Sequence, residues 1–189
     1  MKDIQKDVFE IIDSKFKSRN FFQYEIDLET EELIKSEIER FEVDHPELIS
    51  KILKQIRTDH PSATVQNYTH FFNLDRCLRL IIEFTNEIRF ICQISIFGYF
   101  SIYTAPLITY DGIHYESNLI RFIDVNEMDI CNQIYNSIDE CIPNLKWLPK
   151  SLLEEIVFRL TDLDYLDDST YDSVYNISVG SVLFTKHYG

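Results

Sequence analysis

The feature that most constrains the fold is a stretch of alternating apolar residues on both sides of a short polar segment. Residues 78–84 and 88–96 each place an apolar side chain at every second position, and Thr85-Asn86-Glu87 separate them. A period of two is typical of β-strands with one buried face. The alternating residues are Leu78, Leu80, Ile82, Phe84, Ile88, Phe90, Cys92, Ile94 and Ile96. The sequence therefore predicts two strands joined by a hairpin loop.

A three-residue loop predicts one register for this hairpin. It places Leu80 opposite Cys92 on the buried face and Glu83 opposite Arg89 on the other face. Apolar residues and opposite charges then lie across from suitable partners, which stabilises an antiparallel pair. Because a slip by one residue would turn every apolar side chain to the wrong face, the register is strongly constrained.

The antiparallel pattern continues beyond this hairpin. Gly98 permits a turn before a third strand, and Asp111-Gly112 is typical of a tight turn that pairs Tyr110 with Ile113. Residues 90–110 carry no charge and have the length of a membrane span. Polar residues interrupt this stretch, however, and its apolar residues alternate. We therefore interpret it as strands of a soluble sheet.

Helical spacing of apolar residues predicts helices before and after the strands. Asp3 caps the first helix, the second begins after Thr30, and Pro46 lies in the first turn of the third. A fourth helix begins near Asn126, and a short fifth opens with a capping box at Ser151. The inward stripes are Ile4, Val8, Ile11, Ile12 and Phe16; Leu33, Ile34, Ile38 and Phe41; Leu48, Ile49, Ile52, Leu53 and Ile56; Cys131, Ile134, Ile138, Cys141 and Ile142; and Leu152, Leu153, Ile156, Val157 and Leu160.

The chain ends in a predicted hairpin, in which Tyr175 faces Phe184 across a turn at Val179-Gly180. No linker or low-complexity tract divides the sequence, so residues 1–189 form one domain. The predicted class is α+β: N-terminal helices, a central antiparallel β-meander, two further helices and a C-terminal β-hairpin. We expect the helices to pack on one face of the sheet.

The charge of the chain restricts its partners. The formal net charge is -14, and residues 126–189 carry eleven acidic residues against four basic ones. Such a field repels nucleic acid and anionic membranes, which bind proteins through cationic side chains. A basic protein is the partner that this charge favours.

The N-terminus is charged and lacks the apolar segment of a signal peptide, which predicts a cytoplasmic protein. Cys77, Cys92, Cys131 and Cys141 show no zinc-ligand spacing. In a reducing compartment we expect four free, buried thiols. The abundance of Ile, Lys, Asn, Phe and Tyr with scarce Ala and Gly favours an AT-rich bacterial gene.

No catalytic motif is visible. His45 and His60 each lie in an Asp-His-Pro tripeptide, which we interpret as helix-boundary chemistry because adjacent residues seldom point at each other. His70 and His114 lie on predicted strands and would form a metal site only under one sheet order. The sequence predicts no cofactor, no catalytic residue and no metal ligand.

An acidic segment with interleaved tyrosines is the most conspicuous cluster in the sequence. It does not match a calcium loop, because the residues at the fifth, sixth and twelfth positions are wrong. It is either a solvated loop or a protein-binding surface, since tyrosine is enriched at interfaces. The predicted partner-binding residues are Asp162, Asp164, Tyr165, Asp167, Asp168, Tyr171 and Asp172.

These observations support three hypotheses. The first is a non-catalytic acidic module that binds a basic protein, most concretely an immunity-type protein that neutralises a basic bacterial toxin. The second is an enzyme with a dispersed carboxylate and histidine site, with a metal-dependent reaction as one version of this hypothesis. The third is an adaptor or structural protein.

Overall fold

The computed structural model describes residues 2–15, 28–69, 76–84, 88–110, 113–116, 121–161 and 174–184. Its helices are α1 (Lys2–Lys15), α2 (Leu28–Asp44), α3 (Leu48–Asp59), α4 (Asp129–Asp139), α5 (Lys150–Leu153) and α6 (Val179–Phe184). Its strands are β1 (Thr64–Asn67), β2 (Cys77–Glu83), β3 (Ile88–Ser95), β4 (Tyr99–Tyr110), β5 (Ile113–Glu116), β6 (Arg121–Phe122), β7 (Lys146–Trp147), β8 (Ile156–Thr161) and β9 (Val174–Ser178). This is the predicted α+β class.

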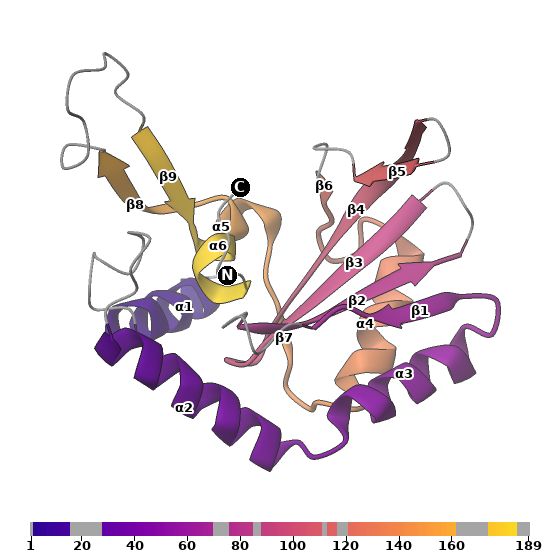
Figure 1. The fold of residues 1–189 in the computed structure, drawn as a ribbon, viewed down its shortest axis with the longest axis horizontal. Coiled ribbons are helices and arrows are strands. Elements are labelled where there is room, and N and C mark those ends of the chain that lie inside the picture. Colours follow the sequence, from indigo (N-terminus) through magenta and orange to yellow (C-terminus); the bar gives the residue numbers. More distant parts are fainter. Residues whose placement is uncertain are drawn as a thin grey trace.

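Strands β1 to β5 form an antiparallel meander in sequence order, and β6 and β7 both pair with β4 (Figure 1). The pairing of β7 with β4 is parallel and joins Tyr99 to Lys146. A separate two-stranded sheet consists of β8 and β9. Helices α3 and α4 lie on one side of the large sheet, whereas α1, α6 and the small sheet lie on the other (Figure 1). The expectation that all helices pack on one face was therefore wrong.

The predicted hairpin register is confirmed. Leu80 lies opposite Cys92, and Glu83 lies opposite Arg89, with which it forms an ion pair. The pairing of Tyr110 with Ile113 is also confirmed, although the turn residues themselves lie outside the described residues. Gly98 has a φ of 80°, a left-handed conformation that suits glycine and closes the turn between β3 and β4.

One apolar core joins both sides of the sheet. It receives side chains from every helix and from β1 to β4, and Ile12, Ile52, Leu80 and Ile134 are fully buried in it. All four cysteines are free and buried, as predicted. In the part of the chain that the structure describes, no helix is long and apolar enough to cross a membrane.

Two helix starts differ from the prediction. Helix α2 begins at Leu28, before Thr30, and α4 begins at Asp129, after Asn126. Asn126 has a left-handed φ of 64°, so it belongs to a turn, and its N–H donates to Asn132 Oδ1 at 3.0 Å. Asparagine tolerates this conformation better than most residues, which explains why a turn competes with the cap here.

The predictions for the C-terminal region were wrong in two places. The predicted helix from Ser151 ends at Leu153, and residues 156–161 form β8 instead. The predicted terminal hairpin does not form: β9 pairs with β8, placing Leu160 opposite Tyr175, and residues 179–184 form α6. Local spacing alone could not distinguish these states, because each segment is only about six residues long.

Gly180 shows what stabilises this arrangement. It is a helical residue of α6, and a Cβ atom there would lie 3.2 Å from the backbone oxygen of Leu153. The missing side chain thus lets α6 approach α5 closely. The Ser95 hydroxyl donates to Leu183 O at 3.0 Å and connects α6 to β3. The glycine is needed for close packing, not for a turn.

Candidate protein-binding surface

The acidic segment that the sequence singled out, Asp162, Asp164, Tyr165, Asp167, Asp168, Tyr171 and Asp172, lies outside the described residues. The structure does describe the residues that flank it. Thr161 ends β8 and lies opposite Val174, which begins β9. The two ends of the segment are therefore adjacent in space.

The histidines support the structural interpretation of the Asp-His-Pro tripeptides. His45 lies between α2 and α3 and stacks at an angle on Phe41, with ring centroids 4.9 Å apart. His60 follows α3, is buried, and contacts Phe84 edge to face at 5.5 Å. His70, His187 and the side chain of His114 lie outside the described residues.

Helices α1 and α2 carry an acidic surface that is only partly neutralised. Their exposed carboxylates that form no ion pair within the described part of the chain are Asp3, Asp13, Glu32, Glu39, Glu42 and Asp44. On α2, Glu32, Glu39 and Glu42 point away from the buried stripe that contains Ile34 and Ile38. Helical periodicity places them on one solvent-facing side.

An apolar side chain lies among these carboxylates. Val43 follows Glu39 by one helical turn and is 77% exposed, the highest value among the large apolar residues described. An exposed apolar side chain within a charged surface supplies contact area that a purely ionic surface lacks. The combination of carboxylates and Val43 is suited to contact with a protein.

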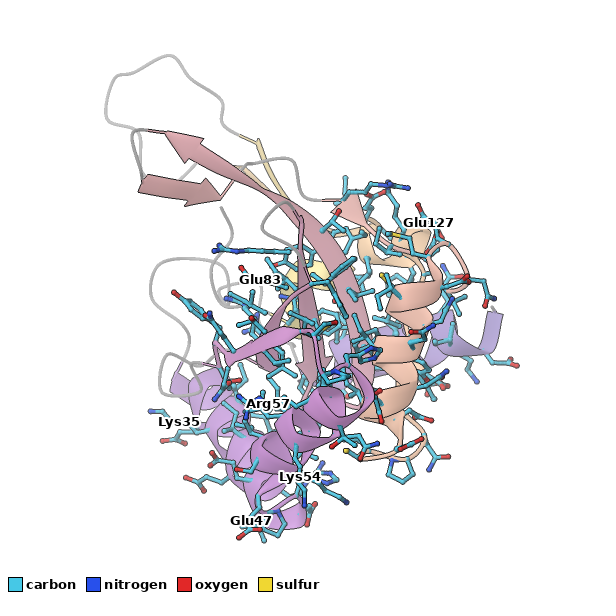
Figure 2. All side chains as sticks on the ribbon, turned by 90° about the vertical axis from the view of Figure 1, so that its right-hand side faces the viewer. Lys35, Glu47, Lys54, Arg57, Glu83 and Glu127 are labelled. Atoms are coloured by element: carbon cyan, nitrogen blue, oxygen red, sulfur yellow. The ribbon has the colours of Figure 1, made fainter. Side chains whose placement is uncertain are left out.

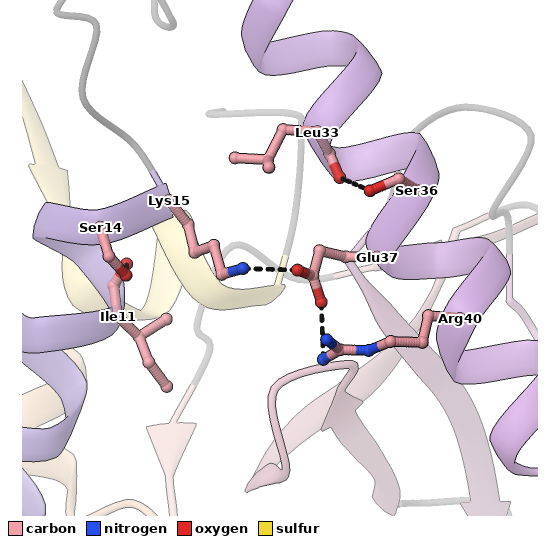
Figure 3. Close-up of polar contacts among 7 residues, drawn as sticks. All are labelled: Ile11, Ser14, Lys15, Leu33, Ser36, Glu37 and Arg40. Carbon is pink, nitrogen blue, oxygen red and sulfur yellow. Dashed lines mark hydrogen bonds and ion pairs between the residues drawn. The ribbon is translucent and has the colours of Figure 1, made fainter.

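Glu37 joins the two helices that carry this surface. Its side chain is 9% exposed; Oε1 accepts from Lys15 Nζ of α1 at 2.5 Å, and Oε2 contacts Arg40 Nη2 of α2 at 2.8 Å (Figure 3). The two cations neutralise the one buried carboxylate of the pair. The sequence analysis missed this contact, because residues 22 positions apart give no local signal.

The carboxylates between α3 and α4 have a different role. Ser137 Oγ donates to Asp59 Oδ2 at 2.6 Å, and Gln55 Nε2 donates to Glu140 Oε2 at 2.9 Å. These hydrogen bonds link the two helices. The outer side of α3 carries cations, including Lys54 and Arg57 (Figure 2). The acidic surface is thus a property of α1 and α2 and does not continue across α3.

A hollow of about 530 Å³ lies where α1 meets the turn between β3 and β4. Asp7, Glu10 and Ser14 line it from α1, and Phe97, Gly98 and Tyr99 line it from the turn and β4. The remaining lining residues are Ile11, Asn144 and Lys146. Lys146 Nζ forms an ion pair with Asp7 Oδ2 at 2.6 Å across the hollow.

Burial raises the pKa of one tyrosine of the hollow and of two buried cysteines. It raises the pKa of Tyr99 to about 12, and the nearby Asp7 carboxylate adds to this effect. It also raises the pKa of Cys131 to about 11 and that of Cys92 well above its usual value. Tyr99 is therefore a neutral hydroxyl at physiological pH, and the thiols lack the electropositive surroundings that activate a nucleophile.

Among the described residues, no group of three His, Cys, Asp or Glu side chains is arranged to hold a metal ion. Comparison of the chain with protein-family models, characterised proteins and solved structures finds no match.

Proposed function

We propose that this chain is a non-catalytic acidic module that binds a basic protein, most concretely an immunity-type protein that neutralises a basic bacterial toxin. The observation that carries the proposal is the group of six exposed carboxylates on α1 and α2 that form no ion pair within the described residues. Clustered like charges repel one another in the folded state and give no evident stability benefit. A cationic partner removes that repulsion.

Two further observations support this proposal. The net charge of -14 steers a cationic partner from a distance and speeds association. Val43 provides apolar contact next to Glu39 and Glu42. The Lys15–Glu37–Arg40 contact connects α1 to α2 and presents the two helices as one surface.

The partner is sought by capture from native lysate, with products of neighbouring genes that carry a basic C-terminal domain as first candidates. We expect the purified chain to bind a basic partner and to abolish its toxic activity at equimolar amounts. Association should slow steeply as salt rises, because screening weakens the attraction between the charges. A captured partner without a basic surface, or one whose activity persists in the complex, would refute the proposal.

Charge variants test which surface is used. Changing Glu39 and Glu42 to Gln should slow association by roughly twofold to tenfold and flatten its salt dependence, while dissociation changes less. The matched control changes Asp129, the first residue of α4, to Asn and Glu140, the residue after α4, to Gln, which removes the same charge elsewhere. Equal slowing by both variants would show that net charge, and not the α1–α2 surface, governs the encounter.

The segment 162–172 is tested in the same assay. Changing Asp164, Asp167 and Asp168 together to Asn slows association if the partner contacts this segment. An unchanged rate and salt dependence would assign the segment to a solvated connection and leave the α1–α2 surface as the proposed contact.

A further inference from the structure

The hollow between α1 and the β3–β4 turn has the features of a ligand site. Its volume of about 530 Å³ falls within the range of sites that hold small groups, roughly 300–1,000 Å³. Three separate parts of the chain line it. These are α1, the β3–β4 turn with Tyr99 at the start of β4, and Asn144 with Lys146 at the start of β7. The parallel pairing of Tyr99 with Lys146 brings the last two together.

Tyr99 supplies a hydroxyl to the lining of the hollow. The residue is 2% exposed, and its hydroxyl has no hydrogen-bond partner among the described residues. The hydroxyl is not one of the described side-chain atoms that are fully buried without a partner, so it faces solvent in the hollow. Tyr99 and Asp7 both line the hollow, and the Asp7 carboxylate adds to the rise in the pKa of the Tyr99 hydroxyl. An incoming group that accepts a hydrogen bond would satisfy it.

The charge of the lining selects a cation. Asp7 and Glu10 contribute two negative charges, and Lys146 contributes one positive charge. The ammonium of Lys146 is already close to Asp7 Oδ2, and both side chains remain nearly half exposed. Within the described part of the chain, Glu10 forms one ion pair, with Lys6 at 3.5 Å, and both side chains are mostly exposed. A carboxylate or phosphate would face two like charges here, whereas an ammonium or guanidinium can replace Lys146 beside Asp7 or Lys6 beside Glu10.

We propose that this hollow receives a lysine or arginine side chain of the basic partner, with its cationic head beside Asp7 and Glu10 and its backbone carbonyl accepting from the Tyr99 hydroxyl. The choice of partner rests on the proposed function above. In the free protein Lys146 forms an ion pair with Asp7, so it competes with the incoming cation for this carboxylate. Binding therefore exchanges one ion pair for another and adds the hydrogen bond to Tyr99.

The test uses the full chain, with N-acetyl-argininamide as the cationic probe and N-acetyl-citrullinamide as a neutral probe of the same shape. In amide NMR spectra the cationic probe should cause saturable shifts at Gly98, Tyr99 and Asn144. Half-saturation should fall on the order of millimolar, the range expected for one side chain. No saturable shift, or equal shifts with the neutral probe, would overturn the proposal.

Variants of the lining give effects of opposite sign. Asp7→Asn with Glu10→Gln should raise the half-saturating concentration about tenfold, and Tyr99→Phe about threefold. Lys146→Gln should lower it severalfold, because it removes the competing cation. The control, Asp129→Asn with Glu140→Gln, removes the same charge elsewhere and should leave the half-saturating concentration unchanged. If the control weakens binding as much, or if Lys146→Gln weakens binding in a folded protein, the proposal is wrong.

Outcomes for the hollow and for the proposed function are separable. If a basic partner is captured but binds the Asp7→Asn, Glu10→Gln variant as tightly as the unchanged chain, the hollow is not the contact and the proposed function stands. If the arginine probe binds as described but the captured partner is not basic, the proposed function fails and the cation site remains. Thermal melting of each variant shows whether a loss of binding reflects loss of the fold.

Discussion

The α3–α4 pair and the α1–α2 pair contribute to the same core, but their outer carboxylates are used differently. Between α3 and α4, Asp59 and Glu140 accept hydrogen bonds from Ser137 and Gln55. On α1 and α2, Glu37 is the buried connection, while six exposed carboxylates lack an ion pair within the described residues. Carboxylates thus accept hydrogen bonds between α3 and α4, whereas most of those described on α1 and α2 face water.

The difference shows that an acidic chain can use some carboxylates to stabilise its fold and leave others exposed to water. A carboxylate that accepts hydrogen bonds within the fold is less available to a partner. A carboxylate that faces water without a neighbouring cation can still attract a distant cation. Three predictions test whether the two helix pairs differ in this way, in order of the expected effect.

The largest effect should come from the shared core. Ile52 of α3 is fully buried, so Ile52→Ala should lower the free energy of unfolding by about 2–5 kcal/mol through lost apolar contact and a cavity. Denaturant titration measures this change. The control, Val43→Ala on α2, should change the free energy of unfolding by less than about 0.5 kcal/mol because Val43 is exposed. Similar losses at both sites would mean that Val43 is covered in solution.

The second prediction concerns thiols in the α3–α4 layer. Burial raises the pKa of Cys131 from 9.0 to about 11, so near pH 8 its thiolate fraction is about a hundredfold lower than that of an ordinary thiol. Labelling of the native chain should be slower by at least that factor than labelling after denaturation. The neutral thiol contributes stability below about pH 9, and this contribution is lost as pH rises towards 11.

The matched control for the labelling is Val43→Cys on α2, which introduces an exposed thiol. It should react at the rate of a free thiol while the four native cysteines remain protected. Rapid labelling of Cys131, or an interchain or intrachain disulfide in the purified protein, would contradict the buried, reduced thiols of this layer.

The smallest effect should come from the contact between α1 and α2. Glu37→Gln removes the charge that neutralises Lys15 and Arg40 and should cost about 1–3 kcal/mol of unfolding free energy. The cost stays moderate because Arg40 and part of Lys15 are open to water. Glu39→Gln, on the solvent-facing side of α2, should change the free energy of unfolding by less than about 0.5 kcal/mol. If both variants lose the same free energy of unfolding, the Glu37 contact does not stabilise the fold more than an exposed carboxylate does.

The meander could be predicted because two independent patterns agree there. The apolar alternation and the charge pair Glu83–Arg89 require the same register, and a slip of one residue violates both. The apolar stripes of α1 to α4 were predictable for the same reason, since each extends over several turns. Helix ends were less accurate at Leu28 and Asp129; before Asp129, the turn at Asn126 competes with capping.

The binding surface could be predicted only in part. The excess of acidic residues follows from composition, and the proposal of a basic partner rests on that excess. The position of Glu37 between Lys15 and Arg40, and the exposure of Glu39 and Glu42, depend on which faces α1 and α2 bury. The hollow required the parallel pairing of Tyr99 with Lys146, which no local pattern indicates.

The sequence by itself determined the class of fold, the register of β2 with β3, the buried stripes and the sign of the charge. These are short-range properties, because strand and helix periods are read from residues within about two turns of each other. Only the tertiary structure decided the state of residues 156–161 and 179–184. In α6, Val179, Val182, Leu183 and Phe184 are buried against α5 and β3, and Gly180 allows the close approach. Burial against distant elements outweighs the weak preference of a six-residue segment, so its conformation is set by its neighbours in space.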